Sequence, residues 1–338
     1  MSTQETKLQA ISDAIKAKLG ITDAIQASQF AGKIGEIQLG EVSLPSWVQT
    51  TLPSNASWSS VCYGNGKFVA IAMDTNKAAY STDGITWTES ALPASASWYS
   101  VCYGDGEFIA VASDSATAAY STDGINWTSS TLPYSNWVSV CYGDGKFVAV
   151  PGGDSDIAVY SMDGITWTES TLPASTSWSS VCYGNNKFVA VTDNGNIAAY
   201  STDGIDWDQT TLPFNTNWNS VCYGNGKFMV VSSAFCAYST DSIDWNYIDL
   251  PDFANNGNIC FVCYGQRKFV IVALGASVAV YSINGLDDDD VEYYNWPQIQ
   301  MPTSGYWISV CYGDGKFVAV AGDSNIAAYL KDCFNEWA

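Results

Sequence analysis

The 338-residue sequence contains no histidine and a single arginine, Arg267. Without histidine, the chain has no imidazole to serve as a general base or a metal ligand, which excludes catalysis of the Ser–His–Asp type. With one guanidinium group, it has no cluster of arginines to clamp an anionic substrate. These two absences remove many of the common catalytic mechanisms, and we expect a protein that is not an enzyme.

Positive charge and long apolar runs are also scarce. The chain has 13 Lys and Arg against 34 Asp and Glu, a formal net charge of −21. Nucleic acids and anionic membrane surfaces attract proteins through Lys and Arg, so neither is expected as a partner. The apolar runs are too short to cross a bilayer, and the polar N-terminus lacks the apolar region of a signal peptide. We therefore expect no membrane insertion and no secretion by that route.

Against these absences stands one tetrapeptide, Val-Cys-Tyr-Gly, which occurs seven times at intervals of about forty residues. Its cysteines are Cys62, Cys102, Cys141, Cys182, Cys222, Cys263 and Cys311. A repeat of this length with four strand-like runs is the signature of a propeller blade. The sequence therefore predicts an all-β fold, a seven-bladed β-propeller with four-stranded blades, over residues 40–338.

One blade shows the expected order of its strands, here called a to d from the inside out. In residues 58–93, strand a is 58–63, strand b is 68–72, strand c is 78–81 and strand d runs up to Leu92-Pro93. Asn65-Gly66 between strands a and b favours a tight type I′ hairpin, because both central residues need positive φ. Gln266-Arg267 holds the same position in the sixth repeat and departs from that chemistry.

The last repeat, unlike the others, has no outer strand after it. Each outer strand is marked by a Trp followed six positions later by a Pro, and the pair Trp47 and Pro53 precedes the first Val-Cys-Tyr-Gly. We therefore predict that the strand from Trp47 to Leu52 closes the seventh blade, which hides both sheet edges. A strand around Trp337 is the alternative.

A second motif, Ser-Thr-Asp-Gly-Ile-x-Trp, follows strand c in most repeats. Its Ser and Asp side chains can bond local backbone N–H groups, its Gly allows positive φ, and its Trp can fill the space between sheets. The motif resembles the Asp-box of sialidase-like propellers, which implies a structural turn; the several arginines of a sialidase site have no counterpart here. The box residues are Ser81, Asp83, Trp87, Ser121, Asp123, Trp127, Ser161, Asp163, Trp167, Ser201, Asp203, Trp207, Ser239, Asp241 and Trp245.

No metal site or other cofactor is expected. Seven of the ten cysteines occupy one repeat position and cannot all pair with one another, so we interpret them as small, buried, reduced residues. Cys260 and Cys263 are three apart on a predicted strand and so point to opposite faces. The acidic insertion at residues 287–292 is read as a solvated loop, with a Ca²⁺ site as the alternative because hard oxygen ligands suit that ion.

Residues 1–39 lie outside the repeats. Leu8, Ile11, Ile15 and Leu19 follow one another at helical spacing and predict a short amphipathic helix that binds a partner or copies of itself. This segment resembles the helical leaders of tail-fibre and baseplate-associated proteins from phages and prophages of Gram-positive bacteria. The resemblance implies a virion protein of the phage tail or capsid surface, made in the host cytoplasm and attached to other virion proteins through residues 1–39. The same segment could also join copies of this chain into a homo-oligomer.

The two faces of the predicted propeller differ in sequence. The a–b and c–d turns on one face are nearly uniform, whereas the b–c and d–a loops on the other vary in length and content, so we expect a ligand on the variable face. Carboxylates, amides and exposed aromatic rings suit sugars. The candidate contacts are Asp114, Tyr134, Asp154, Asp156, Asp193, Asn196, Phe214, Phe253, Tyr306 and Asp323.

Three functions follow from these patterns. The first is a non-enzymatic receptor-binding head that recognises a glycan on the host cell surface. The second is a structural decoration or assembly protein of the capsid or tail that has no host ligand. The third is a glycosidase, since carboxylates are plentiful, but no carboxylate pair stands apart from the repeat pattern.

Overall fold

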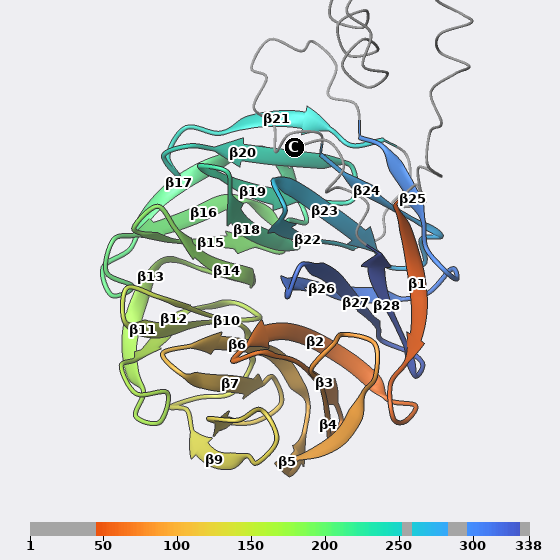
Figure 1. Cartoon of the computed structure of the whole chain (residues 1–338). Helices are drawn as coiled ribbons and strands as arrows, with labels where there is room; N and C mark the ends of the chain where they lie inside the picture. The colour runs from red at the N-terminus through yellow and green to blue at the C-terminus, as the bar shows by residue number, and fades with distance from the viewer. Residues whose placement is uncertain (1–44, 252–258, 283–295, 332–338) are drawn as a thin grey trace, which may run out of the picture. The chain divides into compact units, whose positions relative to one another are not determined.

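The residues that the computed structural model describes are 45–251, 259–282 and 296–331. They form 28 strands in seven antiparallel four-stranded sheets, arranged around a common centre (Figure 1). The predicted seven-bladed β-propeller with four-stranded blades is therefore confirmed. The predicted helix at residues 1–39, with Leu8, Ile11, Ile15 and Leu19, lies outside the described residues, as does the proposed boundary at residue 39.

Each of the first six blades uses four consecutive strands, the first being innermost. The strands of blades one to three are β2 (Ser57–Gly64), β3 (Lys67–Met73), β4 (Thr75–Ser81), β5 (Thr88–Ala96), β6 (Trp98–Gly104), β7 (Glu107–Ala112), β8 (Thr117–Ser121), β9 (Thr128–Thr131), β10 (Trp137–Gly143), β11 (Lys146–Pro151), β12 (Ser155–Ser161) and β13 (Thr168–Thr176). Those of blades four to six are β14 (Trp178–Gly184), β15 (Lys187–Thr192), β16 (Gly195–Ser201), β17 (Asp208–Thr216), β18 (Ser220–Gly224), β19 (Lys227–Val231), β20 (Phe235–Ser239), β21 (Asn246–Asp249), β22 (Cys260–Gly265), β23 (Lys268–Ala273), β24 (Val278–Tyr281) and β25 (Gln298–Gln300).

The seventh blade joins the two ends of the propeller. It consists of β26 (Trp307–Gly313), β27 (Lys316–Ala321), β28 (Ile326–Lys331) and, on its outer side, β1 (Ser46–Thr51). Strand β1 runs antiparallel to β28, with Trp47 opposite Leu330 and Thr51 opposite Ile326. The predicted closure by the strand that contains Trp47 is confirmed; Trp337 lies outside the described residues.

Three of the seven outer strands, β5, β13 and β17, extend further than the sequence suggested. Strand β5 continues through Pro93 to Ala96, and its pairing with β4 shifts register between Thr75 and Lys77. The predicted end at Leu92-Pro93 is wrong for β5, which continues for three residues beyond the proline. An outer strand is paired on one side only, so the missing N–H of Pro93 interrupts no second ladder and the chain remains extended.

The hairpins between the first two strands of each blade share one conformation. Asn65 and Gly66 have φ values of 46° and 70°, as a type I′ turn requires. Gln266 and Arg267, the pair that departs from the favoured residues, have φ values of 46° and 58°. The sheet geometry therefore sets the same turn in the sixth blade, although neither residue favours it.

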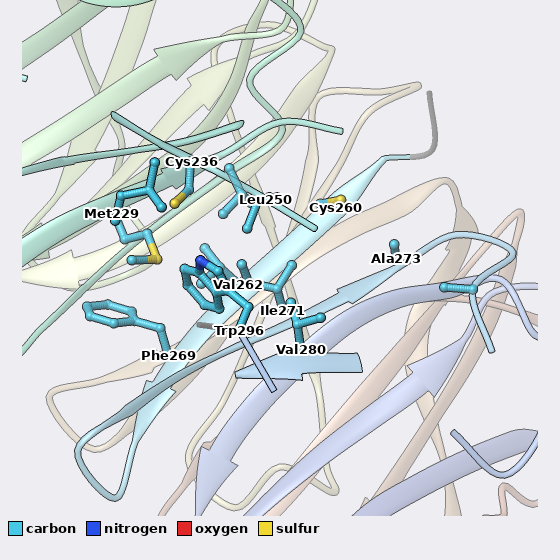
Figure 2. Packing of buried hydrophobic residues seen from close by; sticks show 13 residues of the cluster. Met229, Cys236, Leu250, Cys260, Val262, Phe269, Ile271, Ala273, Val280 and Trp296 are labelled. Carbon is cyan, nitrogen blue, oxygen red and sulfur yellow. The ribbon is translucent and has the colours of Figure 1, made fainter. Parts of the chain in front are cut away.

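Side chains pack between adjacent blades rather than in one central core. The tryptophans that begin the inner strands are 0–1% exposed: Trp58, Trp98, Trp137, Trp178, Trp218 and Trp307. Figure 2 shows the cluster between blades five and six, where Met229 and Cys236 of blade five face Phe269 and Trp296 of blade six. Among the described residues, no cysteine forms a disulfide bond.

The repeated Tyr-Gly pair joins each blade to the next. A Cβ atom built on Gly64 would lie 2.0 Å from Cγ of Tyr103, the tyrosine of the following blade, so only glycine fits there. The remaining pairs are Gly104 with Tyr142, Gly143 with Tyr183, Gly184 with Tyr223, Gly224 with Tyr264, Gly265 with Tyr312 and Gly313 with Tyr63. This sequence of contacts closes on itself, which explains why Gly follows Tyr in all seven repeats.

Candidate functional site

A pocket opens at the centre of the propeller, on the face that carries the b–c and d–a loops. Each inner strand begins at a d–a loop, so the first residues of all seven inner strands meet at this end of the central channel. The pocket has a volume of about 390 Å³ and takes lining residues from every blade. That volume lies within the range of about 300–1,000 Å³ that is usual for small-molecule sites.

A layer of serines forms the uniform part of the pocket wall. Ser60 Oγ accepts a hydrogen bond from the N–H of Val101 in the next blade, at 3.2 Å. The same bond, at 3.1–3.3 Å, is made by Ser100 with Val140, Ser139 with Val181, Ser180 with Val221, Ser220 with Val262, and Ser309 with Val61. Six of the seven joints between blades are thus bridged by a serine hydroxyl.

The seventh joint, from blade six to blade seven, has a different residue. Val262 corresponds to Val61 in the repeat, so Phe261 stands where the other blades have serine. Phe261 is half-buried and lines the pocket. Its ring cannot make the serine bond.

The residue after each starting tryptophan forms the variable part of the wall. The residues at this position in the pocket lining are Ser59, Tyr99, Val138, Ser179, Asn219 and Ile308. In five blades the pairing of the inner strand shifts register here, for example between Trp98 and Ser100. Such bulges redirect a side chain and are common next to binding sites. Tyr99 at this position is 40% exposed.

Two members of this set are already engaged in the scaffold. Ser59 Oγ donates to the carbonyl of Trp98 at 2.7 Å, and Ser179 Oγ donates to the carbonyl of Trp218 at 2.6 Å. Their hydroxyls hold neighbouring blades together. Tyr99, Val138, Asn219 and Ile308 are therefore the members that distinguish one side of the pocket from another.

Apolar groups gather on one side of the pocket. Ile259, Phe261 and Leu274 come from blade six and Ile308 from blade seven, and the backbone N–H of Leu274 bonds to the carbonyl of Ile259 at 3.0 Å. Blades three to five contribute mostly polar groups, among them Asn136, Asp193 and Asn219. The pocket wall is therefore amphipathic.

Among the described residues that line the pocket, Asp193 is the single carboxylate, and none is Lys or Arg. Burial, together with the negative charge of Asp193, raises the pKa of the Tyr99 phenol above its usual value. The described lining contains no pair of carboxylates, which most glycoside hydrolases require.

The structure brings only one of the predicted contact residues to this pocket, namely Asp193. Asp114 is exposed, and its Oδ1 accepts from the N–H of Ser97 at 3.0 Å and from Ser115 Oγ at 3.2 Å. The others among the described residues are not part of the pocket lining: exposed Tyr134, Asp154, Asp156, Tyr306 and Asp323, and half-buried Asn196 and Phe214. Phe253 lies outside the described residues.

Phe214 belongs instead to an aromatic cluster further out on blades four and five. Its ring stacks on Phe235 with centroids 4.4 Å apart and meets the edge of Tyr247 at 4.7 Å. Sequence reasoning missed Tyr99, Phe261 and Ile308, which line the central pocket. A signal was available for Phe261, which replaces the serine of the other six repeats, and for Tyr99 and Ile308 in the variability of their position.

The box residues hold their own turns. In blade three, Asp163 Oδ1 accepts from the N–H groups of Ile165 and Thr166 at 2.9 and 2.7 Å, and from Ser161 Oγ at 3.0 Å. The N–H groups of Thr166 and Ile165 lower the pKa of Asp163. The boxes of blades one, two, four and five repeat these bonds through Asp83, Asp123, Asp203 and Asp241. Kinship with the sialidase Asp-box stays a prediction.

Two further predictions concern a Ca²⁺ site and membrane insertion. The acidic run at residues 287–292 lies outside the described residues, so the Ca²⁺ alternative stays a prediction. Within the described residues, no helix is both long and apolar enough to cross a membrane.

Comparison with known proteins identifies the fold alone. No protein-family model and no curated protein matches the chain. Virginiamycin B lyase from Staphylococcus aureus superposes with a TM-score of 0.73 at 14% identity, over 85% of this chain and 99% of that one. YCF48 from Cyanidioschyzon merolae gives 0.63 at 14% identity, over 84% and 98%. A WD40 propeller domain of Doa1 gives 0.62 at 12% identity, over 86% and 99%.

These similarities support a β-propeller of general type. The lyase has also been solved as a catalytically inactive histidine-to-alanine variant with quinupristin, and YCF48 has been solved bound to a peptide. At such low identity, neither property carries over with the fold.

Proposed function

We propose that this chain is a non-enzymatic virion protein of a phage or prophage, a receptor-binding or tail-fibre head whose central pocket recognises a glycan on the host cell surface. One observation carries the proposal: every blade lines the central pocket, and the residue after the starting tryptophan varies among the blades, as Tyr99, Val138, Asn219 and Ile308 show. Residues 1–39 would attach the head to other virion proteins or to copies of itself.

The chemistry of the pocket favours binding over catalysis. Its wall combines apolar and aromatic side chains with amides and hydroxyls, which suits a ligand that has both apolar faces and hydroxyl groups. One carboxylate without a partner cannot supply both the acid and the base or nucleophile of a glycosidase. A histidine-dependent mechanism like that implied by the inactive lyase variant is excluded, because this chain has no histidine.

The proposal is tested with the fluorescently labelled full chain on a panel of Gram-positive cells. Half of each culture is treated with periodate, which oxidises vicinal diols of surface sugars. We expect binding to some strains and its loss after periodate treatment. Binding that survives periodate would contradict glycan recognition, and absence of binding to every strain would favour a structural decoration or assembly protein.

A further inference from the structure

We infer that Phe261 is the stacking residue of the central pocket and that the pocket accepts an uncharged sugar ring while rejecting an anionic one. This inference rests on the proposed function, which it narrows to a class of ligand and a specificity-determining residue. Three features of the pocket support it: the departure of Phe261 from the serine layer, the apolar groups beside it, and the charge of the lining.

The first feature is the departure itself. At six joints a serine hydroxyl bonds the valine N–H of the next blade, at 3.1–3.3 Å. A phenylalanine gives up that hydrogen bond and adds a large half-exposed apolar surface to a water-accessible pocket. The ring packs in part against the core cluster between blades six and seven, and its remaining surface faces the pocket. The serine hydrogen bond is therefore given up at the one joint where an aromatic ring takes the place of the serine in the pocket wall, and departures from a local rule are expected at functional sites.

The second feature is the surroundings of Phe261. Ile259 and Leu274 of the same blade and Ile308 of the next blade line the pocket with it, so the aromatic ring is part of an apolar wall. Asn219 lines the adjacent part of the pocket, from blade five. A sugar presents C–H groups on one face and hydroxyls around its edge. Such a wall, with an amide beside it, offers contacts to both parts of the ring.

The third feature is charge. Asp193 is the single carboxylate among the described lining residues, and no described Lys or Arg lies there to offset it. An anionic ligand would lose water beside a like charge and find no cation, which costs free energy and provides selection against it. The net charge of −21 acts in the same direction at longer range.

The test uses the full chain and immobilised oligosaccharides that end in glucose, galactose or N-acetylglucosamine, with matched probes that end in glucuronic or sialic acid. Three proteins are compared: the wild type, Phe261→Ser and Phe261→Tyr. Phe261→Ser introduces the residue that six other blades carry at this position, so the variant is expected to fold. Phe261→Tyr keeps the aromatic ring, and melting temperatures report folding for all three.

We expect the wild type to bind at least one neutral probe and none of the acidic ones. Phe261→Ser should weaken that binding about tenfold or more, while Phe261→Tyr stays within about threefold of the wild type. Unchanged binding by Phe261→Ser, or preference for acidic probes, would overturn the inference and leave the proposed function standing. Absence of binding to any probe, together with absence of binding to cells, would overturn both.

Discussion

Blades one to five and blades six and seven are built on the same repeat but depart from it to different degrees. The first five carry the starting tryptophan, the joint serine and the complete box turn. In blade six, Ile259 stands in place of the tryptophan and Phe261 in place of the serine, and the outer strands β24 and β25 have four and three residues. In blade seven, Leu330 replaces the box serine and the outer strand comes from the N-terminal side.

The contrast separates the parts of the repeat that hold the ring together from those that are free to vary. The Tyr-Gly contact is kept in both regions, so ring closure depends on it throughout. The serine layer and the starting tryptophan are lost in blade six, where the apolar side of the pocket lies. The proposed recognition site thus includes the blade in which the repeat is least regular. The following predictions test this division, from the largest expected effect to the smallest.

The side chain at the start of the inner strand should contribute strongly to the free energy of unfolding in a regular blade, and little in blade six. Trp98→Ala removes a side chain that is 0% exposed, and we expect a loss of about 3–5 kcal/mol in the free energy of unfolding. Ile259→Ala, at the equivalent position and 41% exposed, should change it by about 0.5 kcal/mol or less. Chemical denaturation of both variants measures the difference; equal losses would contradict the comparison.

Substitution of the glycine in the Tyr-Gly contact should destabilise the fold by similar amounts in the two regions. In Gly143→Ala the new Cβ would lie 1.9 Å from Cγ of Tyr183, and in Gly265→Ala it would lie 2.1 Å from Cγ of Tyr312. Each substitution forces the ring to move, at an expected cost of about 1–3 kcal/mol. Melting curves should show similar shifts. If Gly265→Ala were tolerated, blade six would not share the packing that closes the ring.

Each serine hydrogen bond between blades should contribute less to the free energy of unfolding than each Tyr-Gly contact does. Ser100→Ala leaves the N–H of Val140 without the hydroxyl that it bonds at 3.2 Å, with an expected loss of about 1 kcal/mol. Phe261→Ser should cause no such loss, because it restores the hydroxyl at the one joint that lacks it. Denaturation midpoints of the two variants test this. A large loss of stability in Phe261→Ser would show that Phe261 holds the ring together and does not belong to the positions that are free to vary.

The smallest expected effect is on the pH dependence of stability. The box aspartates of the regular blades should stabilise the fold at neutral pH and lose this effect in acid. The N–H groups of Thr166 and Ile165 lower the pKa of Asp163. A carboxylate with a lowered folded-state pKa stabilises the fold above its unfolded-state pKa of about 3.9, and this contribution is lost as the pH falls through the folded-state value. Wild type should therefore exceed Asp163→Asn in melting temperature at pH 7, and the gap should narrow below about pH 4. A gap independent of pH would contradict the electrostatic origin.

Much of the architecture could be predicted from the sequence, because the repeat marks the same positions seven times. The blade count and the closure by the strand that contains Trp47 followed from periodicity. The strand end at Pro93 was misplaced, because propensity does not report that a strand is paired on one side only.

The pocket could be predicted only in part. Asp193 was among the expected contacts, but Tyr99 and Phe261 were not, although both are departures from the template. Sequence reasoning looked for ligand contacts in the loops, whereas the convergence of inner-strand ends at the channel mouth depends on the ring geometry. The pairing of the inner strand shifts register at Tyr99, and the sequence carries no clear signal for that shift.

The account depends most on where the ligand binds, and one pair of variants addresses this directly. Tyr99 and Tyr247 are both exposed, by 40% and 55%, but Tyr99 lines the central pocket and Tyr247 belongs to the aromatic cluster on blades four and five. Adsorption of full-length Tyr99→Ala and Tyr247→Ala to cells that bind the wild type is the measurement. The account predicts loss of periodate-sensitive adsorption in Tyr99→Ala and wild-type adsorption in Tyr247→Ala. The reverse result would place recognition on the outer aromatic cluster and contradict the role of the central pocket.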